Sequence, residues 1–306
     1  METLNGRYQG IGVSVQASKE GYIKAISVFD NSPAKEAGIM PGDYITKVNG
    51  TAFGADQLEE AVAEIKGEPG TSVNLTILRV EENSANSKEF DVKVDRADVN
   101  VDTIDDDIVE IDGKKIGYIH IMAFDDVTWN DFSESFNRLK SQDIDGLILD
   151  VRNNPGGALD VVINIADNFL DEGTIVTTKE KDGSETVEKS NGDFDDIPLT
   201  IIQNENSASA SEILAGALKD RGRAKVVGTQ SFGKGVVQKI FNLQNGAGAK
   251  ITISEYFTPN GTQINKVGVK PDIEVEAEED FDISKKDLAN DKQFIYALNE
   301  LLEEIK

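Results

Sequence analysis

The sequence predicts a multidomain α/β protein in which a mostly-β domain precedes an α/β domain with a largely parallel sheet. From Tyr8 to about Val94, short runs of β-branched and aromatic residues alternate with polar ones between turn residues, a pattern typical of strands. Beyond Lys114, apolar strand-like runs alternate with helical patterns, which indicates a layered α/β domain. The length of 306 residues suits roughly two domains of about 150 residues each.

The first domain combines several predicted strands with two helical segments. The strands are expected in "GIGVSVQ", "GYIKAISVF", "DYITKVNG", "SVNLTILRV" and "KEFDVKV". The segment "DQLEEAVAEIKG" is predicted to be an amphipathic helix, because Leu58, Val62 and Ile65 share one stripe and Gly67 stands at its end. A shorter helix in "SPAKEAGIMPGD" is expected to end at Gly38 before a Pro-Gly turn.

This order of elements, with "YQGIGVSV" at its start and "SPAKEAGIMPGDYITKVNG" in the middle, resembles a PDZ domain over residues 8–95. In PDZ domains the loop before the "GIGV"-like strand binds the terminal carboxylate of a peptide, which adds to the sheet edge. The resemblance therefore implies a peptide site at Gly10, Ile11, Gly12 and Val13. The alternative is that the two glycines only make a tight bend.

The second domain is expected over residues 96–306, with a core at about 114–240 and a returning β segment and C-terminal helix at about 241–306. Its "LILDVR" strand is followed by "NNPGG" and its "PLTIIQN" strand by "ENSASAS". Chemistry in such sheets lies beyond the carboxyl ends of the strands, where both motifs fall. The acidic run Asp105–Asp107 is predicted to be a solvated linker. The last helix has an apolar stripe, Phe294, Leu298, Leu301 and Ile305, expected to pack on its own domain or on a second subunit.

Composition excludes several classes of function. The formal charge of −25, from 56 acidic and 31 basic residues, would repel nucleic-acid phosphates and anionic membrane surfaces, so neither is an expected partner. The absence of cysteine excludes disulfides, thiolate metal sites and a cysteine nucleophile. The single histidine, His120, lies in an alternating strand pattern and is predicted to be structural, so a histidine base is not expected. No metal and no cofactor are predicted.

Three serines alternate in "NENSASASEILAGAL", directly before a helical pattern. Ser209 and Glu212 have the spacing of a capping box, which satisfies amide donors at the start of a helix. The same position also suits a nucleophile, because the amides of a helix start can stabilise an oxyanion. Spacing alone does not choose among Ser207, Ser209 and Ser211.

A possible base follows in "QSFGKGVVQ", where Lys234 sits between two glycines. Lys234 and Gln238 are four residues apart, so they share a face of either a strand or a helix. A solvent-exposed lysine beside a turn is the alternative for this segment alone.

The stretch "SASASEILAGALKDRGRAKVVGTQSFGKGVVQ" resembles the catalytic core of the C-terminal processing peptidases, also called tail-specific proteases. The segments "LILDVRNNPGG", "ISEYFTPNGTQIN" and "GVKPDIEV" stand where that family has them. With the PDZ-like segment, most of the chain is covered. The resemblance implies a crotonase-like core in the second domain.

The resemblance implies a Ser-Lys catalytic centre with Ser209 as nucleophile, Lys234 as general base and Gln238 orienting the lysine. It also places the oxyanion donors at the amides of Ala210 and of Gly156 or Gly157. A lysine of ordinary pKa, about 10.4, is protonated at neutral pH, so a basic Lys234 requires a pKa lowered by roughly three units. Burial lowers a lysine pKa in this way, so Lys234 is expected to be dry and screened from carboxylates.

Two further charged residues are given expected roles, Asp220 from the resemblance and Arg79 as the one strong cation near the last strands of the first domain. Asp220 matches a recurrent acidic position of the family and is predicted to be a structural partner of Arg221 or Arg223 at the end of a helix. Arg79, in "LTILRV", is either a surface arginine or a regulatory residue that contacts the protease domain when peptide binds.

The resemblance implies a serine endopeptidase that cleaves proteins near unstructured carboxyl-terminal tails, with the PDZ domain binding those tails and gating activity. The alternatives are a non-catalytic PDZ-containing peptide-binding scaffold and a Ser-Lys amidohydrolase acting on small molecules. Relatives usually carry a leader or anchor and further amino-terminal helices. We therefore expect a bacterial extracytoplasmic protein, periplasmic, cell-surface or secreted, whose leader is absent from this sequence, and a possible homodimer.

Overall fold

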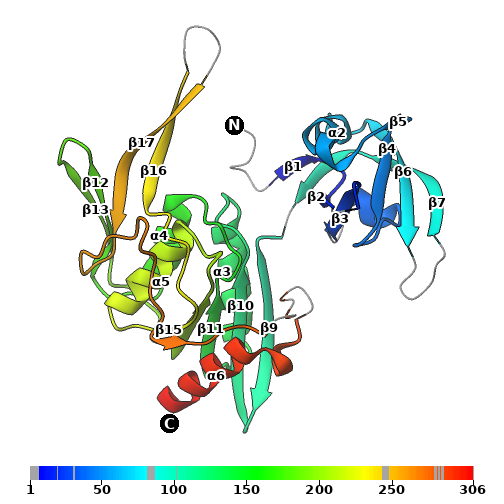
Figure 1. Cartoon of the computed structure of the whole chain (residues 1–306). Coiled ribbons are helices and arrows are strands. Elements are labelled where there is room, and N and C mark those ends of the chain that lie inside the picture. Colours follow the sequence, from blue (N-terminus) through cyan, green and yellow to red (C-terminus); the bar gives the residue numbers. More distant parts are fainter. Residues whose placement is uncertain are drawn as a thin grey trace. The chain divides into compact units, whose positions relative to one another are not determined.

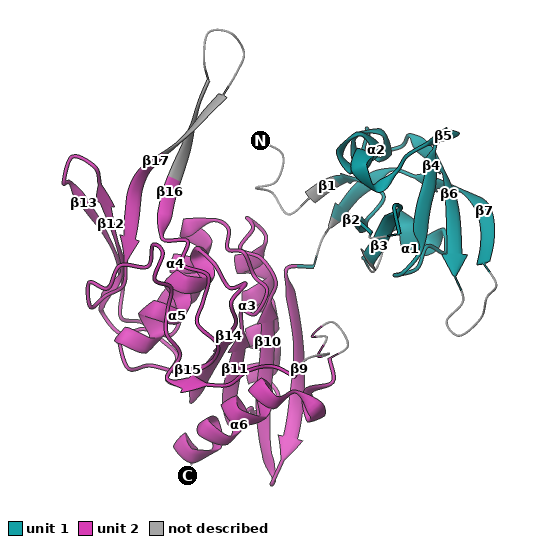
Figure 2. Cartoon of the chain, in the orientation of Figure 1, with its two compact units in different colours: residues 1–102 teal, residues 103–306 magenta. Residues whose placement is uncertain are grey.

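The computed structural model describes residues 7–18, 20–29, 32–80, 87–100, 102–242, 248–278, 281, 283 and 286–305. The chain divides into two compact units, within residues 1–102 and 103–306 (Figure 2). The division falls after the predicted boundary near residue 96, because strand β8 (Ala97–Asn100) pairs with strand β1 (Arg7–Gly10) and so belongs to the first unit. The predicted hairpin tip at residues 81–86 lies outside the described residues.

The first unit is mostly β, as predicted. Its other elements are β2 (Val13–Ala17), β3 (Ile23–Val28), α1 (Pro33–Glu36), β4 (Tyr44–Val48), β5 (Thr51–Ala52), the 3-10 helix η1 (Ala55–Gln57), α2 (Leu58–Ile65), β6 (Ser72–Val80) and β7 (Ser87–Asp95). The main sheet is antiparallel, in the order β2-β3-β4-β6-β7, so β2 is an edge strand. The core contains Ile23, Ile45 and Leu75 from the strands and Ile65 from α2, which confirms the amphipathic helix.

The second unit is a mixed α/β domain. Its elements are β9 (Ile104–Ile111), β10 (Lys114–Ile121), α3 (Thr128–Lys140), β11 (Gly146–Asp150), α4 (Leu159–Asp167), β12 (Gly173–Glu180), β13 (Glu185–Ser190), β14 (Leu199–Gln203), α5 (Ala210–Asp220), β15 (Lys225–Gly228), β16 (Val236–Asn242), β17 (Gly248–Phe257), β18 (Ile273–Glu274), the 3-10 helix η3 (Leu288–Asn290) and α6 (Lys292–Glu304). The larger sheet has the order β18-β15-β14-β11-β10-β9 and is parallel except at β9, which confirms the predicted largely parallel sheet. A second sheet, β13-β12-β17-β16, is antiparallel.

Alternate side chains of the parallel strands serve two cores, because successive residues of a strand point to opposite faces. Leu147 and Leu149 of β11 pack with helices α3, α4 and α5, whereas Ile148 packs with α6. Figure 1 shows these helices and the sheet. Phe294, Leu298 and Leu301 of α6 are buried in this second core, so the C-terminal stripe packs on its own domain.

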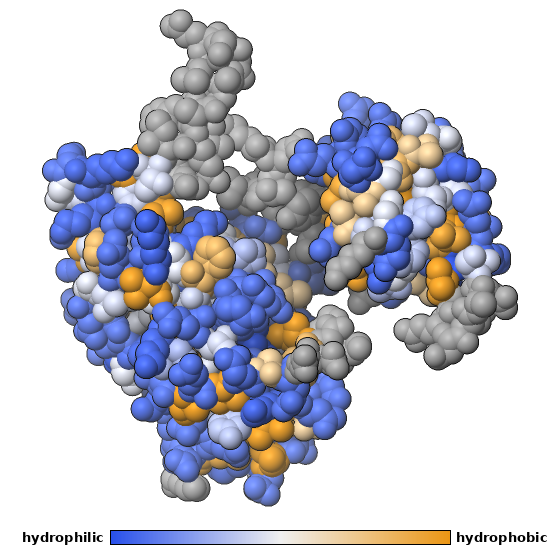
Figure 3. Space-filling model, in the orientation of Figure 1, coloured by the Kyte–Doolittle hydropathy of each residue, from blue (hydrophilic) through white to orange (hydrophobic). Residues whose placement is uncertain are grey.

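One element departs from the sequence analysis. The acidic run Asp105–Asp107, predicted to be a solvated linker, lies within β9 and pairs along its length with β10. Ion pairs with cations distant in sequence neutralise two of these carboxylates: Asp106 pairs with Arg138 and Asp105 with Lys286. Other acidic residues remain on the surface, and the face in Figure 3 is largely hydrophilic, in keeping with the net charge of −25.

Candidate active site

Ser209 occupies a strained turn between β14 and α5. Its backbone has φ 55° and ψ −111°, a conformation that a non-glycine residue rarely adopts and that costs of order 1–3 kcal/mol. A strand, a strained residue and a helix form the nucleophile elbow of many hydrolases, in which the turn presents a hydroxyl and the helix start presents amides. The sequence pattern identified the helix start but not this strain.

The other two serines of the motif are structural. Ser207 is buried and its hydroxyl donates to the carbonyl of Val151 at 2.7 Å. Ser211 is buried and its hydroxyl donates to the carbonyl of Asn154 at 2.9 Å. Ser209, by contrast, is only half-buried. The tertiary structure thus separates three serines that spacing alone could not distinguish.

Glu212 ties the turn at Ser209 to the segment that carries Lys234. Its carboxylate is fully buried, and one oxygen, Oε2, accepts from the backbone amides of Ser209 and Lys234, each at 2.8 Å. The amide nitrogens of Ser209 and Lys234 therefore lie no farther apart than twice that distance. The other oxygen, Oε1, accepts from the Ser231 hydroxyl at 2.6 Å and the Gly233 amide at 2.7 Å. The local sequence pattern indicated only a capping role for Glu212, because its second set of partners is distant in sequence.

The side chain of Lys234 is exposed, so the prediction that it lies in dry surroundings is wrong for this structure. Both flanking glycines press against a crossing segment: a Cβ at Gly235 would lie 2.3 Å from the Asn265 amide nitrogen, and one at Gly233 would lie 3.1 Å from that of Val267. Because the glycines occupy the packed side, Lys234 is left on the solvent side. Among the described residues, no carboxylate is within ion-pair distance of its ammonium group. The backbone of Gln238 lies in β16, but its side chain lies outside the described part of the structure.

The loop "NPGG" packs directly against the turn at Ser209. A Cβ at Gly156 would lie 2.7 Å from the Ser209 Cβ, and one at Gly157 would lie 2.2 Å from the carbonyl oxygen of Phe124. The Gly156 amide already donates to Asn154 Oδ1 at 2.8 Å. For the amides of Gly157 and Ala210, no acceptor is found within the described part of the chain. Of the two predicted glycines, Gly157 therefore has the amide that is free to receive an oxyanion.

Behind this loop lies a buried network of charges. The Arg152 guanidinium bonds Asp150 at 2.5 Å and Asp291, the N-cap of α6, at 2.6 Å, and Tyr118 donates to Asp150 at 2.8 Å. Burial opposes ionisation of Asp150, but the Arg152 guanidinium, with a smaller contribution from His120, holds the pKa of that carboxyl below its ordinary value. Burial, with Asp150 nearby, raises the pKa of Tyr118.

This network was not predicted from the sequence, although the charged pair that ends the apolar run "LILDVR" was a signal for it. His120 makes a structural contact beside it: its Nε2 lies 3.2 Å from the carbonyl oxygen of Arg152. The predicted partners of Asp220 were wrong. Asp220 accepts from the Asn260 amide at 2.9 Å, while Arg221 pairs with Asp171, because each helix-end side chain reaches a different neighbouring loop.

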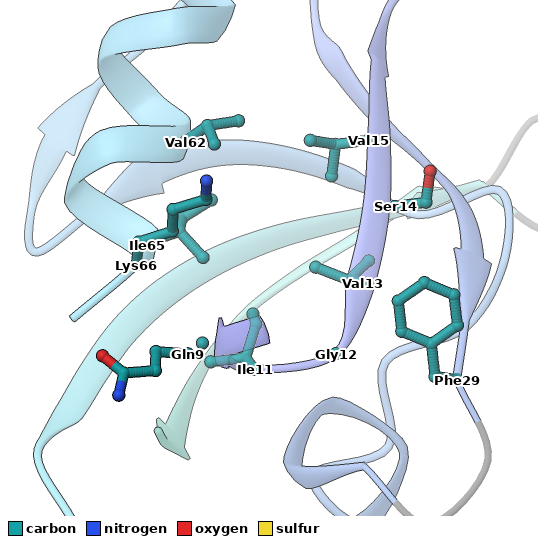
Figure 4. A pocket seen from close by; sticks show the side chains of 11 residues that line it. Gln9, Ile11, Gly12, Val13, Ser14, Val15, Phe29, Val62, Ile65 and Lys66 are labelled. Carbon is teal, nitrogen blue, oxygen red and sulfur yellow. The ribbon is translucent and has the colours of Figure 1, made fainter. Parts of the chain in front are cut away.

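The first unit carries a groove of about 300 Å³ between β2 and α2 (Figure 4). All four residues assigned to peptide binding line it. The complete lining is Gln9, Gly10, Ile11, Gly12, Val13, Ser14, Val15, Phe29, Val62, Ile65 and Lys66. The carbonyl groups of Ile11 and Gly12 accept from Ala34 and Phe29 and so fix the loop. Gly12 has φ +80°, and a Cβ there would lie 2.3 Å from Ser32 Cβ, so the loop requires glycine.

Arg79 forms hydrogen bonds with residues of the first unit. Its guanidinium bonds both oxygens of buried Asp43 at 2.7 Å and donates to the Gly38 carbonyl. The hydrogen bond with Asp43 raises the pKa of Arg79. In this structure the arginine fixes the loop from Gly38 to Asp43.

Residues 115–275 match the model of peptidase family S41, and residues 26–79 match a PDZ domain. The first match covers more than half of the chain. The chain therefore belongs to peptidase family S41 and carries a PDZ domain, as the resemblance implied.

Relatives agree with this assignment. The chain is 36% identical over 304 residues to a carboxyl-terminal-processing protease of Picosynechococcus sp., covering 99% of this chain and 72% of the relative. It is 36% identical over 282 residues to a carboxy-terminal-processing protease of Bartonella bacilliformis, covering 90% and 63%. With the carboxy-terminal processing protease CtpB of Bacillus subtilis, the identity is 36% over 284 residues, covering 90% and 56%. The chain thus spans somewhat more than half of the length of several relatives.

Among solved structures, a photosystem II D1 C-terminal processing protease is 29% identical with a TM-score of 0.56, covering 87% of this chain and 72% of that one. An S41 protease from Bacteroides fragilis, at 16% identity and a TM-score of 0.61, shares the fold. Within the described residues, no helix is long and apolar enough to span a bilayer, and no cluster of three potential metal ligands is found.

Proposed function

We propose that the chain is a serine endopeptidase that cleaves proteins near their carboxyl-terminal tails. Ser209 is the nucleophile, Lys234 the general base, Gln238 the residue that orients the lysine, and the amides of Ala210 and Gly157 receive the oxyanion. The observation that carries the proposal is the Glu212 carboxylate, which holds the backbones of Ser209 and Lys234 on one oxygen atom.

The chemistry requires an unprotonated lysine. The neutral amine takes the hydroxyl proton as Ser209 Oγ attacks the scissile carbonyl, and the resulting ammonium protonates the leaving amine. Water then hydrolyses the acyl-enzyme. Because Lys234 is exposed in the free protein, we infer that a bound polypeptide covers it and lowers its pKa by desolvation.

Cleavage of an unstructured polypeptide tests the catalytic residues. Fragments mapped by mass spectrometry should disappear in both Ser209→Ala and Lys234→Ala, whereas Lys181→Ala, an exposed lysine in the turn between β12 and β13, should cleave normally. Tail binding without cleavage by the wild type would favour the non-catalytic scaffold. Cleavage by either catalytic-site variant at the wild-type rate would refute the assigned roles.

We propose further that the groove of the PDZ domain captures the substrate tail by strand addition to β2. Support comes from the edge position of β2 and from the apolar side chains of Val13, Val15 and Val62 in the groove. Tethering a tail raises its effective concentration near the cleft, and occupancy of the groove gates cleavage. A regulatory role for Arg79 rests on its place among the last strands of the PDZ domain, whereas an extracytoplasmic location and a homodimer rest on family resemblance. Cell fractionation and light scattering of the purified chain test the last two.

A further inference from the structure

The residues around Lys234 alternate sharply in exposure. Ser231, Gly233 and Gly235 are buried, whereas Phe232 and Lys234 are exposed. Phe232 is 66% exposed, a high value for a large aromatic side chain. Its aromatic ring and the lysine side chain therefore both lie on the solvent side of the segment.

The backbone of this segment is firmly held, so the exposure of Phe232 is built into the fold. The Phe232 amide donates to the Ser207 carbonyl at 3.0 Å. On one side Ser231 Oγ donates to Glu212, and on the other the Gly233 carbonyl accepts from Lys266 at 2.8 Å. These bonds fix the backbone, so the Cα–Cβ bond of Phe232 is held toward the solvent side.

A second exposed apolar residue lies on the segment that crosses this one. Val267 is 50% exposed, and its amide nitrogen would lie 3.1 Å from a Cβ placed at Gly233. Single exposed apolar residues are ordinary on protein surfaces. Phe232 and Val267 lie on adjoining segments, and the bond from the Phe232 amide to the Ser207 carbonyl places Phe232 beside the turn that presents Ser209.

We propose that Phe232, supported by Val267, forms an apolar wall of the cleft that contacts the substrate side chain next to the scissile bond. This inference rests on the proposed peptidase function and identifies a specificity-determining residue for it. The occupant is an apolar side chain of the polypeptide substrate. The wall adjoins Lys234, so the same contact would help to remove water from the lysine.

A matched pair of phenylalanine variants tests the proposal. Phe194 is also exposed, at 41%. It lies near the carboxyl end of α4, because the amide of the next residue, Asp195, donates to the Asn168 carbonyl. Gly157 of the candidate site precedes the amino end of that helix, so Phe194 lies at the opposite end from the site. Phe194→Ala is therefore the control for Phe232→Ala. Circular dichroism should show both variants folded, because neither side chain belongs to a core.

The measurement is kcat/KM for quenched-fluorescence peptides that differ only in having leucine or the similarly sized asparagine on either side of the scissile bond. The leucine preference at one of these two positions should fall about tenfold in Phe232→Ala, should persist in Phe232→Leu, and should be unchanged in Phe194→Ala. An unchanged preference, or an equal loss on every peptide, would overturn the role of Phe232 and leave the proposed function standing. No cleavage by the wild type would overturn the proposed function and this inference with it.

Discussion

Replacing Glu212 by glutamine should uncouple the nucleophile from the base. The amide keeps the size of the side chain but turns one accepting oxygen into a donating NH₂ group. The Ser231 hydroxyl can turn and accept from the NH₂ group, but a backbone amide cannot, so with NH₂ at the Oε1 position the Gly233 amide, next to Lys234, loses its acceptor and is pushed away. An unsatisfied buried donor costs about 1–3 kcal/mol, so the free energy of unfolding should fall by about that amount.

The activity should fall further than stability alone explains. A displacement of about 1 Å between reacting groups can reduce the rate about 100-fold. We expect kcat of Glu212→Gln to decrease at least that much with little change in KM, measured at a temperature where denaturation curves show the variant to be folded. Ser231→Ala removes one donor on Oε1 and the acceptor of the Val269 amide but leaves the Gly233 bond and both bonds to Oε2, so the folded variant should retain most activity. A folded Glu212→Gln enzyme with wild-type kcat would refute the positioning role.

Three other predictions follow from the same geometry. Gly157→Ala would place a Cβ 2.2 Å from the Phe124 carbonyl oxygen, so kcat should fall by about 100-fold or more as the oxyanion donor is displaced, and a normal kcat would exclude that donor. The pKa of Asp150 is lower in the folded than in the unfolded protein, so its contribution to stability is present at neutral pH and should be lost as the pH falls below the ordinary aspartate value of about 3.9. The urea midpoint of Asp150→Asn should therefore depend less on pH in that range than the midpoint of the wild type. An equal dependence in the two proteins would contradict this. Val62→Asp should weaken binding of apolar tail peptides at least tenfold by calorimetry, because it puts a charge in the groove, whereas Ala63→Asp, exposed on the same helix outside the lining, should bind normally.

The sequence by itself determined much of the secondary structure and the resemblance that located the site. Periodicity and end signals are set by residues within a few positions of one another, which is why α2 and α6 were predicted close to their observed positions. Motif resemblance likewise singled out Ser209 and Lys234 and the groove at Gly10–Val13. None of these conclusions required a contact between distant residues.

Only the tertiary structure decided which local features act together. The hydroxyls of Ser207 and Ser211 donate to carbonyls of the loop after β11, and Glu212 bonds a segment about twenty residues away. Spacing in the sequence reveals neither contact. Lys234 was predicted to be buried, but the packed glycines on either side leave its side chain exposed. The charge run Asp105–Asp107 was predicted to be a linker, but distant cations stabilise it as part of a strand. Hydrogen bonds and ion pairs between remote segments depend on how the chain folds back on itself. A local sequence pattern does not specify which distant segments come together.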